Sequence, residues 1–159
     1  MATTSLNYAA AATLTITLAS LATATWREST AVDNTTNKYT DALLGGKIMT
    51  GTTPTVNTTI EVYLYGTYDG TAYTAGASGT DAAYTADGEE LLFPVAQIIQ
   101  VDATSDQQYV FGPISVAAAF GGVLPSKWGV VVKNSSAVAL NATGSNHEIK
   151  FIGVKTDIA

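Results

Sequence analysis

His147 is the only histidine in the chain, so any catalytic arrangement that needs an imidazole must use it. It lies between Asn146 and Glu148, beside a stretch that we expect to be extended. The chain has no Gly-x-Ser-x-Gly segment, the sharp turn that presents the nucleophilic serine in many hydrolases. We therefore interpret His147 as a surface residue and not as a catalytic base.

Paired carboxylates are the other chemistry that needs few residues, because glycoside hydrolysis uses only two. Glu89 and Glu90 are adjacent, but neighbouring residues of a strand point to opposite faces. The glycine and aspartate residues before them favour a turn instead. None of the usual criteria for an active site is met, so we expect that the protein is not an enzyme.

Metal and cofactor sites are not predicted either. Asp81, Asp87 and Glu89 carry oxygen ligands that Ca²⁺ accepts, but their spacing fits no known calcium-binding loop. A chain with one histidine and no cysteine cannot build a typical zinc site. It also lacks the glycine-rich loops that bind phosphate groups. We expect no cofactor and no metal.

Tyrosines are the most prominent candidates for binding. Tyr63 and Tyr65 alternate with aliphatic residues, which predicts that both point outward from a strand. Between Gly66 and Glu90 there are five glycines and three tyrosines, Tyr68, Tyr73 and Tyr84, but no aliphatic side chain larger than alanine. A long loop of this kind usually has a function. We predict either a solvated loop or a β-hairpin arm that lies on a neighbouring subunit.

Two uses of these tyrosines remain open. Outward aromatic side chains stabilise protein interfaces, and they also form the flat platforms on which sugars stack. The predicted partner interface consists of Arg27 and the five tyrosines named above, Tyr63, Tyr65, Tyr68, Tyr73 and Tyr84.

Charge limits the partners. The chain has 7 basic and 13 acidic residues, a net charge of −6, so nucleic acid and anionic membranes are not expected to bind it. No lysine or arginine occurs between Lys47 and Lys127, whereas eight acids lie there. An acidic middle with mildly basic ends is compatible with docking on a partner through one face.

The elements expected to carry these residues are strands. Alanine and threonine each occur 25 times, and threonine favours strands because its Cβ is branched. Alternation of apolar and polar residues predicts about eight strands, over 13–18, 22–26, 42–48, 59–65, 95–101, 109–116, 128–132 and 149–154. Apolar residues on both sides of 95–101 favour a covered central strand, and Pro113 places 109–116 at an edge or a bulge. The apolar positions change phase within 149–154, which indicates a β-bulge.

This pattern predicts an all-β fold, an antiparallel two-sheet sandwich or jelly roll, as a single domain over residues 1–159. Alanine runs at 8–12 and 116–120 allow a helical turn or two at most. The uncharged stretch 9–26 lacks the preceding basic residues of a signal peptide. Because its leucine and isoleucine residues alternate with threonine, we interpret it as a strand.

Four segments resemble known proteins: Leu-Ala-Ser-Leu-Ala-Thr at 18–23, Arg-Glu-Ser-Thr-Ala-Val-Asp-Asn at 27–34, Asp-Ala-Leu-Leu at 41–44, and Ile-Glu-Val-Tyr-Leu-Tyr-Gly-Thr-Tyr-Asp-Gly at 60–70. They resemble small virion structural proteins of tailed bacteriophages. The resemblance covers about the first 70 residues and implies a sandwich or jelly-roll fold and no catalytic residues.

The same resemblance implies a function in the virion. The expected function is capsid decoration, in which a cement protein staples neighbouring subunits of the major capsid protein. The protein would act on the capsid surface as a homo-oligomer, with a trimer preferred over a dimer. The alternative is a carbohydrate-binding module that recognises host glycans from a virion or cell surface. Burial of the termini against a shell favours the first function, and a concave aromatic site favours the second.

Overall fold

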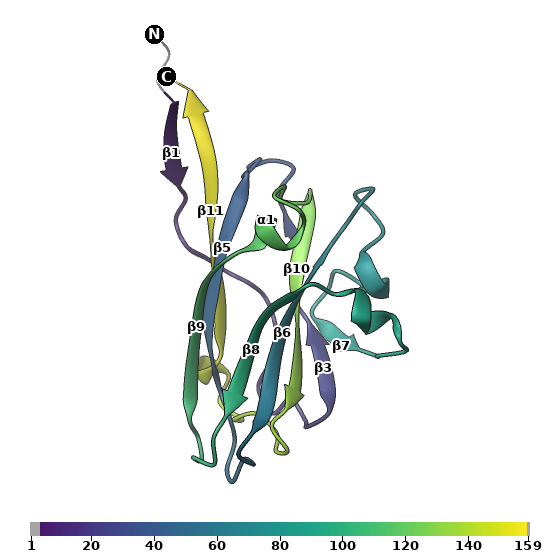
Figure 1. The fold of residues 1–159 in the computed structure, drawn as a ribbon, viewed down its shortest axis with the longest axis vertical. Coiled ribbons are helices and arrows are strands. Elements are labelled where there is room, and N and C mark those ends of the chain that lie inside the picture. The colour runs from purple at the N-terminus through teal and green to yellow at the C-terminus, as the bar shows by residue number, and fades with distance from the viewer. Residues whose placement is uncertain (1–3, 159) are drawn as a thin grey trace.

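Two antiparallel β-sheets pack face to face in the computed structural model, which describes residues 4–158 (Figure 1). The described chain is nearly all β, which confirms the predicted fold class. It has eleven strands where the sequence predicted about eight. They are β1 (Thr4–Tyr8), β2 (Ala12–Thr13), β3 (Thr25–Glu28), β4 (Val32–Asp33), β5 (Asp41–Met49), β6 (Thr58–Gly66), β7 (Ala82–Tyr84), β8 (Val95–Val101), β9 (Gln108–Ser115), β10 (Lys127–Ser135) and β11 (Glu148–Ile158).

One sheet, called sheet A, has the order β1-β11-β5-β9, and β2 also pairs with β11. The predicted inward face of β5 is confirmed, since Ala42, Leu44 and Ile48 are fully buried. Strand β9 lies at the edge, as Pro113 predicted, and the pairing register of β5 and β9 shifts between Leu44 and Gly46.

The other sheet, called sheet B, has the order β7-β3-β10-β6-β8, and β4 also pairs with β10. Alternate residues of β6 and β10 point into the sandwich, as predicted. The fully buried residues of these two inward faces are Ile60, Val62, Leu64, Trp128, Val130 and Val132. The ring of Trp128 meets the ring of Phe151 from sheet A edge-on, with 5.2 Å between centroids, so it joins the two layers.

Helices are short. Residues 4–158 contain one α-helix, α1 (Val116–Ala119), and the 3₁₀ turns η1 (Thr74–Gly76), η2 (Glu89–Leu92) and η3 (Gly144–Asn146). The hydroxyl of Ser115 caps α1 by accepting a hydrogen bond of 3.1 Å from the backbone N–H of Ala118. This confirms the helical turn expected at 116–120, whereas the other alanine run, 8–12, forms none.

Strand β8 is at the edge of sheet B, so the prediction of a covered central strand was wrong. Ile99 and Val101 point into the core and are buried, but Val95 and Ile98 are more than half exposed. The apolar residues on the second side of β8 therefore lie on the surface.

The N-terminal stretch follows the predicted burial but not the predicted strands. Leu14 and Leu18 are buried between exposed threonines, yet β2 ends at Thr13. The second predicted strand, 22–26, begins only at Thr25, because the left-handed φ of 59° at Ala24 is incompatible with an extended strand.

The bulge predicted within 149–154 is not on β11: the pairing with the N-terminal strands shifts by one residue, but the extra residue lies between Tyr8 and Ala12. Strand β11 pairs with β5 from Glu148 to Val154 without a change of register. It then continues alone with β1 to Ile158. The two strands extend together past the end of the sandwich, and we call this part, Thr4–Tyr8 with Val154–Ile158, the terminal ribbon (Figure 1).

The segment 66–90, which we call the cover segment, is neither a solvated loop nor an arm on a neighbour. It folds over the outer face of sheet B, where β7 pairs with β3. Beneath it lies a second apolar cluster of Trp26, Tyr65, Ala75, Ala77, Phe93 and Val131. Small alanine side chains and tyrosine rings take the place of aliphatic residues in this cover.

Candidate protein-interaction site

The predicted interface tyrosines mostly hold the chain's own cover segment in place. Tyr65 points to the outer face of sheet B, as predicted, but it is fully buried there and its hydroxyl donates a hydrogen bond of 2.6 Å to the backbone oxygen of Ser29, so it is not exposed to a partner in the single chain. Tyr84 donates a hydrogen bond of 2.8 Å to the backbone oxygen of Ala75. Tyr73 meets the Tyr65 ring edge-on, with 5.4 Å between centroids. Alternation alone could not reveal that a later segment covers this face.

Tyr63 and Tyr68 differ from the other three tyrosines. Tyr63 is partly buried and donates a hydrogen bond of 2.6 Å to Glu61. Burial and this carboxylate together raise the pKa of Tyr63. Tyr68 is 87% exposed, so of the predicted tyrosines it offers the most surface to a partner.

Arg27 makes an internal ion pair and is not a free surface cation. Its Nε donates a hydrogen bond of 2.6 Å to Asp81, and its Nη2 donates one of 2.9 Å to the backbone oxygen of Asp81. Thr17 also donates to the Asp81 carboxylate, from its backbone N–H at 3.0 Å. Burial by itself would raise the pKa of Asp81, but the hydrogen bonds from Arg27 and Thr17 outweigh it and lower the pKa. The pair ties the cover segment to β3.

We expect Asp81→Asn to lower the free energy of unfolding by about 1.5–3 kcal/mol at neutral pH, the range for hydrogen bonds to charged groups. Because the folded-state pKa of Asp81 is lowered, its contribution is present above the ordinary carboxylate pKa and is lost as the pH falls through the lowered value. Urea unfolding at pH values from neutral to strongly acidic should therefore show the difference shrinking in acid. Asp87→Asn, at an exposed turn, is the control, and a difference independent of pH would contradict the role of the ion pair.

His147 has a structural position. Its Nδ1 accepts a hydrogen bond of 3.4 Å from the backbone N–H of Met49, so Nε2 carries the proton and donates to the backbone oxygen of Asn141 at 2.8 Å. Burial lowers the pKa of His147, which keeps the ring neutral. The residue is partly buried between the end of β5 and the loop that carries Asn141, and the expectation of a surface residue holds only in part.

The carboxylates considered for catalysis or calcium are dispersed or already bonded. Glu90 accepts a hydrogen bond of 2.7 Å from the backbone N–H of Gly88, and Asp87 accepts one of 3.3 Å from that of Glu89, as the predicted turn requires. Asp81 is bound to Arg27. Within residues 4–158 no three histidine or acidic side chains gather as a metal site would require.

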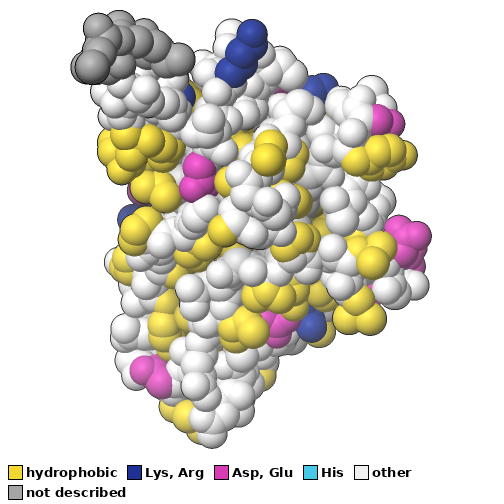
Figure 2. All heavy atoms as spheres, turned by 45° about the horizontal axis from the view of Figure 1, so that its top comes forward, with side chains coloured by type: hydrophobic (Ala, Val, Ile, Leu, Met, Phe, Trp, Pro, Cys, Tyr) yellow, Lys and Arg dark blue, Asp and Glu magenta, His cyan; other side chains and the backbone are white. Residues whose placement is uncertain are grey.

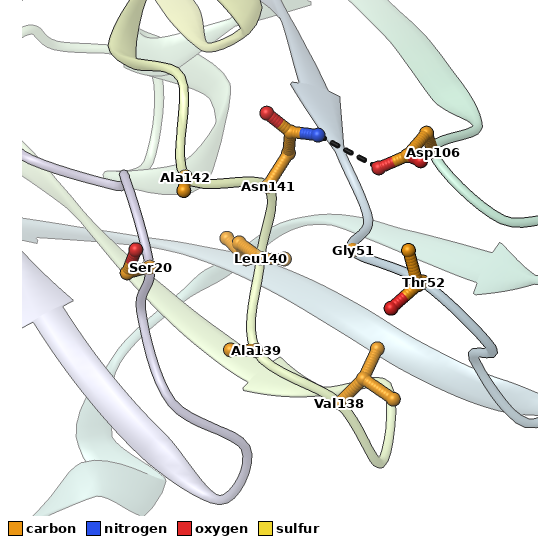
Figure 3. A pocket seen from close by; sticks show the side chains of 9 residues that line it. All are labelled: Ser20, Gly51, Thr52, Asp106, Val138, Ala139, Leu140, Asn141 and Ala142. Atoms are coloured by element: carbon orange, nitrogen blue, oxygen red, sulfur yellow. Dashed lines mark hydrogen bonds between the residues drawn. The ribbon is translucent and has the colours of Figure 1, made fainter.

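A hollow of about 530 Å³ lies between the loops at the end of the sandwich opposite the terminal ribbon (Figure 3). Its rim is fixed by the Asn141 side chain, which donates a hydrogen bond of 2.7 Å to Asp106 across the opening. The other polar side chains of its lining are the hydroxyls of Ser20 and Thr52. No side chain that lines it can act as a base beside those hydroxyls except Asp106, which is already bonded.

A second hollow, of about 260 Å³, lies on sheet B at the margin of the cover segment. Trp26, Tyr63 and Phe93 supply aromatic walls, and Glu90 and Lys133 supply charges. The ammonium of Lys133 sits over the Trp26 ring, 4.9 Å from its centroid, and pairs with Glu61 at 3.5 Å. Because this lysine covers the ring, the hollow is not the open aromatic platform that sugar stacking needs.

The terminal ribbon has two chemically different faces. Residues directly opposite each other in an antiparallel pair point to the same side, so Leu6 and Tyr8 share a face with Thr156 and Val154. Leu6 is 58% exposed and Tyr8 is 57% exposed. Figure 2 shows hydrophobic side chains gathered over this part of the molecule. The ribbon therefore presents an apolar face to solvent.

The opposite face of the ribbon is polar, and its side chains bond to one another. Asn7 donates a hydrogen bond of 2.8 Å to Asp157, and Lys155 pairs with the same carboxylate at 3.5 Å. These contacts lower the pKa of Asp157, with the Asn7 hydrogen bond as the main cause. The ribbon was not predicted, because no strand was expected before residue 13 and the last predicted strand ended at 154.

The outer face of sheet A contains an open apolar groove of about 470 Å³. Leu43 of β5, Ile152 of β11 and Pro113 of β9 line it, together with the Cα of Gly45. This face has no covering segment among the described residues, in contrast to sheet B. Apolar surface is thus left open on the ribbon and on the sheet that carries it.

No protein-family model matches the chain, and no curated protein or solved structure matches it. Among residues 4–158, no helix is long and apolar enough to span a membrane.

Proposed function

We propose that the protein is a structural subunit of a virion, which decorates a capsid shell and staples neighbouring capsid subunits. The observation that carries this proposal is the terminal ribbon, whose apolar face is exposed in the single chain. A β-sandwich that holds such a ribbon clear of its body is built for contact with another protein. The resemblance to small phage virion proteins points to the same function.

The energetics of the ribbon support a partner. A two-stranded ribbon is only marginally stable in water unless its apolar face packs on something. In this chain Leu6 and Tyr8 pack on little of the sandwich, since both are more than half exposed. Contact with a partner would bury them and stabilise the pairing of β1 with β11.

The proposed partners are the major capsid protein and other copies of the chain. Several copies on one shell gain affinity by multivalency even when each contact is weak. The proposed location is the capsid surface, with a cyclic oligomer and preferably a trimer. We propose no catalytic activity and no cofactor.

Binding to shells tests this function directly. Purified protein is mixed with shells of the major capsid protein and the mixture is pelleted, with Leu6→Asp/Tyr8→Asp as the altered ribbon. We expect the natural chain to pellet with shells and the double variant to lose most of that binding. Val56→Asp is the matched control, because Val56 is 54% exposed in a loop away from the ribbon. Failure of the natural chain to bind or stabilise the shells would exclude the stapling role.

Glycan binding is the second candidate, and its site would be the hollow that Trp26, Tyr63 and Phe93 line on sheet B. Lys133 and Glu61 would have to move before a sugar ring could stack on Trp26. Retention of the protein on immobilised host glycans, lost in Trp26→Ala, would favour this candidate over the capsid.

A further inference from the structure

We infer that the apolar face of the terminal ribbon of one copy docks into the groove on sheet A of a second copy. The inference rests on the proposed assembly function and names the partner of the ribbon. It follows from two apolar surfaces that one chain exposes and cannot bring together by itself.

The ribbon supplies two large side chains on one side. Leu6 and Tyr8 alternate with Asn7, whose side chain is held on the polar face by Asp157. Docking through the apolar face leaves those polar groups in water, so no hydrogen bond is lost. Leucine and tyrosine also bury much apolar area, and aromatic side chains are enriched at interface cores.

The groove supplies a matching apolar surface. At about 470 Å³ it falls within the range of roughly 300–1,000 Å³ that binding pockets occupy. Gly45 also lines the groove, and a Cβ at that position would lie 3.0 Å from the backbone oxygen of Phe111, so β5 and β9 approach closely there. Leu43, Ile152 and Pro113 form the walls. A tyrosine and a leucine side chain fit a site of this size and polarity.

The two surfaces cannot meet within one chain. Ile152 of the groove and Thr156 of the ribbon lie on the same side of strand β11, so the two surfaces follow each other along one face of this strand. The described pairing of β11 has no bulge at which the strand could reverse. Folding the ribbon back would break the pairing of β1 with β11, so a ribbon that occupies the groove has to come from a different molecule.

Charge favours a second copy in this orientation. Lys150 lines the groove itself, and Lys47 and Glu148 lie next to it on the same face of sheet A. The cover segment on sheet B carries the acidic side chains Asp69, Asp81, Asp87, Glu89 and Glu90. Contact through sheet A keeps the acidic sides of two copies apart, which a contact through sheet B would not do.

Complementation between two variants tests the inference. The ribbon variant is Leu6→Asp/Tyr8→Asp, and the groove variant is Leu43→Asp. Masses are measured by size-exclusion chromatography with light scattering for each variant alone and for their mixture. Ribbon-to-groove docking predicts that the natural chain self-associates and that each variant alone dissociates at least about tenfold more readily.

The mixture is the decisive sample. The groove variant keeps an intact ribbon, and the ribbon variant keeps an intact groove, so one junction forms and the mixture contains dimers. A mixture that stays monomeric overturns the inference, as does self-association of the ribbon variant equal to that of the natural chain. Val56→Asp should associate like the natural chain. Thermal unfolding of Leu43→Asp checks its fold, and the ribbon variant, altered only at exposed positions, tests the inference independently of that check.

Disulfide trapping gives the geometry, because the natural chain has no cysteine. An oxidised mixture of Tyr8→Cys with Ile152→Cys should yield a heterodimer. Cross-linking of Tyr8→Cys alone, without the heterodimer, would mean that ribbons pair with each other and would overturn ribbon-to-groove docking.

Failure of this inference is distinguishable from failure of the proposed function. If the natural chain is monomeric in light scattering but still pellets with shells, the ribbon binds the capsid protein and the docking between copies is wrong. If the chain associates through the groove but does not pellet with shells, the docking stands and the capsid function is wrong.

Discussion

Trp128→Ala is expected to lower the free energy of unfolding by about 3–5 kcal/mol, the usual cost of replacing a buried tryptophan with alanine. Trp128 is fully buried at the centre of the sandwich and contacts Phe151 of the opposite sheet. Its truncation removes the ring that joins the two layers and leaves a cavity too well enclosed to collapse. Urea unfolding followed by circular dichroism measures the change.

Tyr68→Ala is the matched control, since it also removes an aromatic ring but from an 87% exposed position. It should change stability by less than about 0.5 kcal/mol. Equal stability of Trp128→Ala and the natural chain would mean that Trp128 is not a core residue and would contradict the assignment of β10.

The inward faces of the sandwich could be predicted from the sequence because the apolar character of each side chain there indicates that it is buried. Alternation placed Ile60, Val62 and Leu64 in the core, and all three are fully buried. The same reasoning located Trp128. In these strands one face packs on the core, so the alternation of apolar and polar residues is enough to identify the buried face.

Outer faces could not be predicted in this way, because their environment depends on segments far away in sequence. Tyr65 alternates like an exposed residue, yet the cover segment buries it completely. Val95 and Ile98 look like core residues, yet they lie on an edge strand. Alternation gives the side of the sheet to which a residue points but not what lies on that side.

The candidate site was unpredictable for a related reason. Strand β1 has the sequence Thr-Ser-Leu-Asn-Tyr, and all five residues are exposed. Its order comes from pairing with β11, 146 or more positions away, and not from burial. Arg27 and Tyr84 were predicted at an interface because one is charged and the other aromatic. In the structure they bond to Asp81 and Ala75 of the same chain.

Removing residues 71–86 should destabilise the whole protein, because this segment is part of its packing. The deletion takes away β7 and uncovers Trp26, Tyr65 and Val131 on the outer face of sheet B. At ~1.5–3 kcal/mol for each large buried side chain, the loss is roughly 5–9 kcal/mol. Natural domains have a total stability of about 5–15 kcal/mol. We therefore expect a deletion variant that is largely unfolded or unfolds at much lower urea concentration.

A buried carboxylate adds to this loss. Glu28 of β3 is nearly inaccessible, and it accepts hydrogen bonds from Ser78, of 2.7 Å from the backbone N–H and 2.6 Å from the hydroxyl. Without the segment, Glu28 loses these partners, and a carboxyl group without hydrogen bonds next to an apolar cluster is costly unless water reaches it. Arg27 loses Asp81 at the same time.

A variant in which glycine and serine replace residues 71–86 at equal length separates lost packing from strain at the new junction. If lost packing causes the instability, this variant should be as unstable as the deletion. Its chain length is unchanged, so the junction is not strained, but the packing side chains Tyr73, Ala75 and Tyr84 are gone. If only the deletion is unstable, the junction is responsible and the cover segment contributes little. A replacement variant as stable as the natural chain would make the segment a dispensable loop, and the tyrosines would again be candidates for contact with a partner.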